Sequence, residues 1–150
     1  MSEPSRILSD SLFSYLQHER FVLLHTIDAE TSGPTSSVIS WVYAADPGRI
    51  RMALDASSRL VANMKANNRV ALTIFAAGAV NAVYGRASEV TDSLEDVPFR
   101  MACFDVHITE VRNALFYGAR MAMEPEIEKT YDRRAAAKLD QQVFAAMRKA

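Results

Sequence analysis

Three residues able to bind an anion, Ser57, Ser58 and Arg59, stand side by side where a short helix is predicted to begin. They follow a predicted strand over Ile50–Leu54 and open a helix over Ser58–Ala66. A helix N-terminus presents unpaired backbone N–H groups and the positive end of the helix dipole, so it attracts phosphate. Serine hydroxyls and a guanidinium can donate further hydrogen bonds to phosphate oxygens. Serine is also a favoured N-cap, so a plain capped helix with a solvated Arg59 explains the segment equally well.

Other catalytic chemistries find less support in the sequence. His18, His25 and His107 lie far apart, and Cys103 with His107 supplies only two potential metal ligands. We therefore predict no metal site. There is no G-x-S-x-G elbow, and neither G-x-G-x-x-G nor a Walker loop occurs. Catalytic residues are not assigned, and Cys103 is interpreted as a small core residue.

Composition and charge narrow the class of protein. The 150 residues suit one domain over 1–150, and 49% are hydrophobic and 23% charged. The net charge of −1 gives no support for partners such as nucleic acid or an anionic membrane. A single cysteine forms no intrachain disulfide, and the start of the chain lacks the pattern of a signal peptide. A cytoplasmic location is the expectation.

Hydrophobic periodicity predicts a mainly β protein with flanking helices. We expect helices over Ser5–Glu19, Ser58–Ala66, Ser93–Phe104 and Asp132–Arg148, the last within a C-terminal helical extension of about 120–150. We expect strands over Phe21–Asp28, Thr35–Ala44, Ile50–Leu54, Val70–Phe75, Asn81–Val90 and Thr109–Tyr117. Six short strands in hairpin order indicate an antiparallel barrel. The absence of β-α-β alternation argues against a doubly wound nucleotide-binding sheet.

The order of these segments carries a family resemblance between Ser11 and Val90. The pieces are F-V-L-L-H-T-I-D, a G-P turn, S-V-I-S-W-V-Y, R-I-R-M-A-L-D, S-S-R-L-V-A-N-M, N-N-R-V-A-L-T-I and V-Y-G-R-A-S-E-V. As a set they resemble the pyridoxamine 5'-phosphate oxidase-like superfamily, the FMN-binding split barrels. The resemblance implies a six-stranded Greek-key split barrel that forms a homodimer with its flavin sites at the subunit interface.

The resemblance also implies which residues bind the cofactor. The FMN phosphate would lie at the start of the short helix, against Ser58 and Arg59 with Ser57 beside them. Residues of the second and third strands would border the rest of the flavin: Ser40, Trp41 and Val42 along the ring system, and Leu54 and Asp55 near the ribityl–phosphate end. Asn63 matches a family asparagine that we interpret as packing the helix.

Two positions depart from the family pattern at the phosphate. Leu60 stands where a lysine is common, which removes a charge-assisted contact worth about 1.5–3 kcal/mol, or roughly 10- to 150-fold in affinity. Leu54-Asp55 stands where the third strand often ends in a threonine that contacts the cofactor, and the Asp55 carboxylate would repel a phosphate unless it is turned away or paired. Arg59 and Arg51 are the nearest cations that could compensate.

The leading hypothesis is an FMN-dependent oxidoreductase acting on a small-molecule substrate that the sequence does not identify. Val38 and Tyr43 stand where the true pyridoxamine 5'-phosphate oxidases carry Arg and Lys, so that specific activity is rejected. One alternative keeps the fold and changes the cofactor to a deazaflavin or haem. Another is a cofactor-free dimeric binding or stress-related protein.

Overall fold

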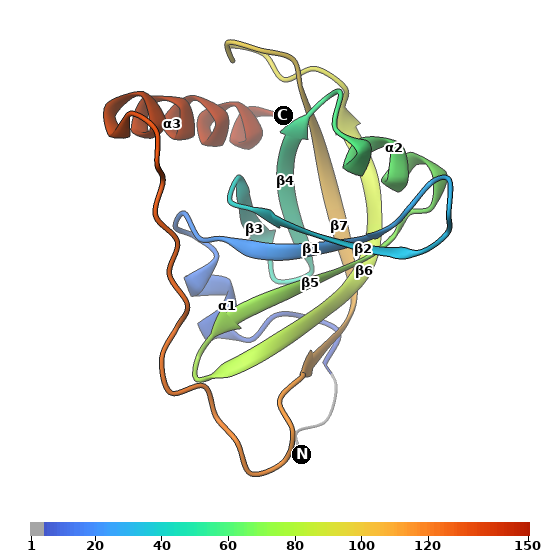
Figure 1. Cartoon of the computed structure of the whole chain (residues 1–150), viewed down its shortest axis with the longest axis vertical. Coiled ribbons are helices and arrows are strands. Elements are labelled where there is room, and N and C mark those ends of the chain that lie inside the picture. The colour runs from blue at the N-terminus through green and yellow to red at the C-terminus, as the bar shows by residue number, and fades with distance from the viewer. Residues whose placement is uncertain (1–4) are drawn as a thin grey trace.

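A single antiparallel sheet organises the computed structural model, which describes residues 5–150 (Figure 1). Its strands are β1 (Val22–Ile27), β2 (Pro34–Ile39), β3 (Val42–Asp46), β4 (Arg49–Asp55), β5 (Arg69–Ala76), β6 (Ala79–Thr91) and β7 (Met101–Asn113). The helices are α1 (Asp10–Tyr15), α2 (Arg59–Ala66) and α3 (Arg133–Lys149). The prediction of a mainly β protein with flanking helices is confirmed.

The sheet is curled, and the two strands at its edges, β2 and β3, follow one another in the chain. The hydrogen-bonded order is β2-β1-β5-β6-β7-β4-β3, and every neighbouring pair is antiparallel. Only Ser40 and Trp41 separate β2 from β3, although β2 pairs with β1 and β3 pairs with β4. In Figure 1, β1 and β2 cross in front of β4 and β7. This curl encloses the core.

Two apolar clusters lie on opposite sides of the curled sheet. The inner cluster collects inward-facing residues of the strands, such as Val22 and Leu24, and α1 adds Leu12 and Leu16. The outer cluster is covered by α3, and its members are Tyr43, Ala53, Leu94, Met101, Cys103, Val143, Phe144, Ala146 and Met147. Burial raises the pKa of the Cys103 thiol to about 11, so it stays un-ionised among these side chains.

The structure corrects the prediction of six strands to seven strands within residues 5–150. The predicted strand Thr35–Ala44 is broken into β2 and β3, because Ile39 pairs with Val22 whereas Val42 pairs with Met52. One segment therefore serves two partners at opposite edges of the sheet. Neither Gly nor Pro marks the break in the sequence, so local pattern gave no signal for it.

Two predicted helices also require correction. Ser93–Phe104 is not helical: β7 already begins at Met101, since its backbone pairs with β4 on one side and β6 on the other. The predicted strand Thr109–Tyr117 is only the second part of β7, which ends at Asn113. The first helix is shorter than Ser5–Glu19, and begins where the Ser9 hydroxyl accepts a hydrogen bond from the Leu12 amide at 3.2 Å. The two differences at β7 reflect long-range pairing, which local periodicity does not encode.

Gly85 of β6 lies where that strand shifts register against β7. A Cβ at this position would come within 2.5 Å of the His107 carbonyl oxygen and 2.7 Å of Val106 Cγ1. Because the backbone would have to move, Gly85→Ala is expected to lower the free energy of unfolding by about 1–3 kcal/mol in urea titrations. Gly48→Ala is the control, since its Cβ would meet only Asp46 Oδ1, at 3.5 Å. Equal losses in the two variants would contradict this reading of β6.

Candidate cofactor site

A cleft of about 240 Å³ opens where β2 breaks into β3, against the end of β4. Its lining residues are Val38, Ile39, Ser40, Trp41, Ala53, Leu54 and Asp55. The Trp41 carbonyl accepts a hydrogen bond from the Ala53 amide at 3.0 Å, which joins the two sides. The structure thus brings together four of the residues predicted to border the flavin. Val42 is separate from them, because its side chain is fully buried in the inner cluster.

The end of β4 leads directly from this cleft to the start of α2. Ser58 is the N-cap of α2, and its hydroxyl accepts a hydrogen bond from the Leu60 amide at 3.1 Å. A cleft whose lining strand leads into a helix N-terminus is suited to a ligand with an apolar body and an anionic end. Ser58 can cap the helix and also contact an anion, because its hydroxyl accepts the capping hydrogen bond with its oxygen and can donate its proton.

Asp55 is turned toward the chain that follows it. Its Oδ1 accepts hydrogen bonds from the Ser57 hydroxyl at 2.6 Å and from the Ser57 amide at 2.8 Å. These hydrogen bonds lower the pKa of Asp55, the side-chain contact having the larger effect. The carboxylate is therefore ionised near neutral pH, and it engages a hydroxyl that was expected at the phosphate.

Arg59 points outward from the first turn of α2 and already has an acidic neighbour. Its Nη2 lies 3.3 Å from Asp28 Oδ2, and 69% of its side chain is exposed. Asp28 in turn accepts hydrogen bonds from the amides of Glu30 and Thr31, which lower its pKa. An exposed ion pair of this kind is weak, so the guanidinium can turn toward an incoming anion.

The structure changes the interpretation of the departure at Leu60 and of its expected compensation by Arg51. Leu60 is only 7% exposed and packs in the inner cluster, so its side chain does not face the phosphate position. Arg51 cannot compensate for a missing lysine, because its guanidinium is bound to Asp105 and to carbonyl groups of α3. Arg59 is left as the cation at the start of α2.

Asn63 holds α2 against the sheet, in line with its expected packing role. Its Oδ1 accepts a hydrogen bond from the Ala29 amide at 2.9 Å, and its Nδ2 donates to the Thr26 hydroxyl at 3.0 Å. With both polar ends satisfied, the buried amide fixes the position of α2 on β1.

Residues near the C-terminus contact a wall residue of the cleft from outside it, and sequence patterns did not point to them. The Trp41 indole donates from Nε1 to Asp140 Oδ1 of α3 at 2.8 Å, across 99 positions in sequence. Lys129 bridges Glu19 and Asp140, with an ion pair of 3.1 Å to Glu19 Oε1. Burial, and after it the neighbouring Asp140 side chain, raise the pKa of Glu19.

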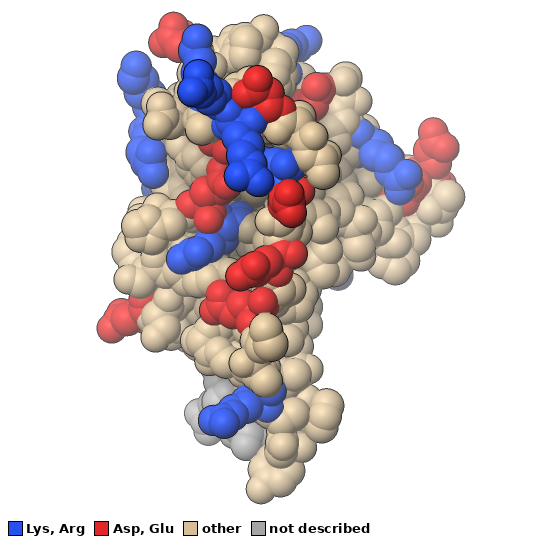
Figure 2. Space-filling model, turned by 60° about the vertical axis from the view of Figure 1, so that its left-hand side comes forward, with Lys and Arg blue, Asp and Glu red and all other residues tan. Residues whose placement is uncertain are grey.

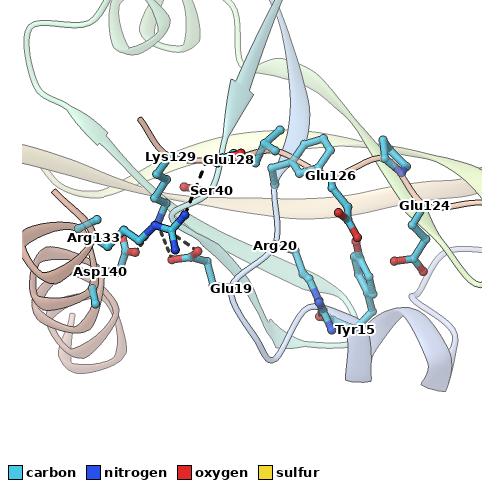
Figure 3. Close-up of a pocket in the computed structure, with 15 residues that line it drawn as sticks. Tyr15, Glu19, Arg20, Ser40, Glu124, Glu126, Glu128, Lys129, Arg133 and Asp140 are labelled. Carbon is cyan, nitrogen blue, oxygen red and sulfur yellow. Dashed lines mark hydrogen bonds and ion pairs between the residues drawn. The ribbon is translucent and has the colours of Figure 1, made fainter. Parts of the chain in front are cut away.

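A larger cavity of about 600 Å³ adjoins this network beneath the segment 124–129 (Figure 3). Ser40 lines both this cavity and the cleft. In Figure 3, Lys129 points between Glu19 and Asp140, whereas Glu124 lies beside Tyr15. Figure 2 shows acidic and basic side chains interspersed over one face of the molecule, as the net charge of −1 suggests.

Comparison with known proteins identifies the family. A sequence profile of the pyridoxamine 5'-phosphate oxidase family matches residues 8–133. The chain belongs to the pyridoxamine 5'-phosphate oxidase-like split-barrel family. No curated protein sequence matches the chain significantly.

Solved structures of this family share the fold at low identity. A proposed pyridoxamine 5'-phosphate oxidase from Lactobacillus delbrueckii is 18% identical with a TM-score of 0.60, covering 72% of this chain and 95% of its own. An F420 reductase is 14% identical with a TM-score of 0.60, covering 70% and 98%. General Stress Protein 26 from Bacillus anthracis is 12% identical with a TM-score of 0.52, covering 68% and 95%. These identities establish the shared fold alone.

Two further observations concern the described part of the chain. Residues 5–150 contain no group of three or more His, Cys, Asp or Glu side chains arranged to hold a metal ion. Within the same residues, no helix combines the length and apolar character that crossing a membrane requires.

Proposed function

We propose that this chain binds FMN and acts as an FMN-dependent oxidoreductase on a small molecule. The observation that carries the proposal is that Asp55, at the end of β4, lines the cleft with Ser40 and Trp41, and that the chain continues from it directly into the N-terminus of α2 at Ser58 and Arg59. The cleft offers an apolar wall for a ring system, and the helix start offers donors and a cation for a phosphate. Membership of the pyridoxamine 5'-phosphate oxidase-like family supports this assignment.

The residues of the cleft fit the parts of the cofactor with one exception. Trp41 would contact the flavin ring and Leu54 the ribityl chain, while Arg59 and the first amides of α2 would hold the phosphate. Asp55 opposes the phosphate, although its hydrogen bonds to Ser57 spread part of its charge. Bound FMN would supply the hydride and electron chemistry, and the protein supplies binding and orientation.

We further propose that the working form is a homodimer with the cofactor between subunits. A cleft of about 240 Å³ is open on its outer side and holds only part of a flavin, since ligand pockets are usually about 300–1,000 Å³. A second copy would supply the remaining wall. Sedimentation analysis should therefore give a mass near 33 kDa, twice 16.7 kDa, whereas a monomer that still binds FMN would contradict the shared site.

The experiment that tests cofactor binding is a titration of the purified protein with FMN, followed by flavin fluorescence anisotropy and absorption. We expect saturable binding and a rise in the unfolding temperature, because a ligand specific for the native state stabilises it. Absence of binding at micromolar FMN would overturn the proposal.

Two alternative ligands belong in the same titration. The structural likeness to an F420 reductase makes the F420 deazaflavin the first to test, and haem follows. The negative charge of Asp55 at the helix start favours the second candidate function, a cofactor-free dimeric binding or stress-related protein. A dimer whose unfolding temperature ignores all three cofactors would support it.

A further inference from the structure

Trp41 lines the cleft, and its indole is hydrogen-bonded to Asp140, a residue that lies outside the cleft. It is the only tryptophan of the chain, and its ring lies 6.3 Å from that of Phe99, with the two planes tilted by 42°. The indole N–H donates to Asp140 Oδ1 at 2.8 Å. An indole has a single donor, so this hydrogen bond selects one of the ring orientations that the surrounding packing permits.

Asp140 is itself held in place by charge. Its second carboxylate oxygen accepts from Lys129, which also pairs with Glu19. The side chain of Asp140 is only 13% exposed and that of Lys129 is 26% exposed, so solvent screens these contacts less than a surface pair. The carboxylate therefore has little freedom to turn away from the indole.

The docking of α3 does not depend on this contact. Val143 and Met147 of α3 are fully buried in the outer cluster, and Arg51 donates to the Met147 and Ala150 carbonyls at 2.9 and 2.8 Å. Those anchors lie in the second half of the helix, whereas Asp140 lies in the first half. A substitution at Asp140 can therefore alter the indole while α3 remains in place.

We propose that Asp140 is a positioning residue that fixes the Trp41 indole at the cleft, so that cofactor affinity depends on α3. The inference rests on the proposed flavin function for its consequence, but the positioning itself is measurable without a ligand. The outward chain of contacts runs from Trp41 through Asp140 and Lys129 to Glu19. Aromatic contacts with a planar ligand are sensitive to ring orientation, which is why the tether matters for binding.

The test is a double-mutant cycle on FMN affinity, read from flavin fluorescence anisotropy in four proteins. These are the wild type, Asp140→Ala, Trp41→Phe and the double variant. We expect Asp140→Ala to weaken FMN binding about tenfold in the wild type, the size of one lost charge-assisted contact, and to have little effect in Trp41→Phe. Lys138→Ala, an exposed position on the same helix, is the matched control and should leave the affinity unchanged.

Tryptophan emission supplies the second readout, in the absence of any cofactor. We expect Asp140→Ala to shift the emission to longer wavelength and to increase quenching by acrylamide, with α-helical circular dichroism unchanged. An equal loss of affinity in both Trp41 backgrounds, or an unchanged emission spectrum, would overturn the positioning role. If the wild type binds none of the cofactors, the proposed function fails, and the emission spectra still decide whether Asp140 fixes the indole.

Discussion

Replacing Asp105 with alanine is expected to lower the free energy of unfolding by about 3–5 kcal/mol, the largest stability effect that we predict for this chain. Asp105 is 4% exposed and Arg51 is 8% exposed. Their contact is bidentate, with Arg51 Nε to Oδ1 at 2.7 Å and Nη2 to Oδ2 at 3.0 Å. These hydrogen bonds hold the pKa of Arg51 above its ordinary value, so alanine at 105 would leave a buried charge without its partner.

The consequence should extend beyond the pair itself. The same guanidinium donates to the last turn of α3 through the Met147 and Ala150 carbonyls, which links β4, β7 and α3. Urea unfolding followed by circular dichroism would measure the loss, with Asp92→Ala as the matched control. Asp92 pairs with Arg100 in the open, at 59% and 64% side-chain exposure, so its loss should cost less than about 1 kcal/mol. Similar losses in both variants would contradict the structural role of the buried pair.

Sequence patterns located most strands because short runs of apolar and β-branched residues coincide with strands that have a buried face. The β1 strand shows this directly: its buried residues alternate with partly exposed ones from Val22 to Ile27, and the apolar run predicted a strand over Phe21–Asp28. The patterns failed where long-range partners decide the structure. The break at Ser40 and Trp41 follows from two different pairing partners. The early start of β7 follows from pairing on both of its edges.

In the candidate site, too, the features set by local sequence were predictable and those set by long-range contacts were not. The start of α2 was predictable, because a serine before a helix is a local signal that the structure confirms at Ser58. The buried position of Leu60 was not predictable, because comparing a single position with a family motif does not show whether that side chain faces the core or the ligand. Asp140 could not be found either, because it meets Trp41 only through the path of the chain between 114 and 132.

Opposite changes in FMN affinity are expected from the two charges at the start of α2. Arg59→Ala should weaken binding about tenfold, the lower end for a charge-assisted contact, because the guanidinium is exposed and Asp28 competes for it. Asp55→Asn should strengthen binding about fivefold, since it removes a repulsive charge near the phosphate in a solvated site. Asparagine still accepts the hydrogen bonds from Ser57, so the turn into α2 is retained.

The pH dependence separates this electrostatic account from a change of shape. Hydrogen bonds lower the pKa of Asp55 below its ordinary 3.8, so its carboxylate stays charged between pH 5 and 8, whereas a phosphate monoester loses its second proton at about pH 6. The advantage of Asp55→Asn over wild type should therefore grow as the pH rises through that value and shrink as salt is added. Arg69→Ala, beyond the other end of α2, is the control and should leave FMN affinity unchanged. If both charge substitutions weaken binding, or neither alters it, the phosphate does not lie at the start of α2.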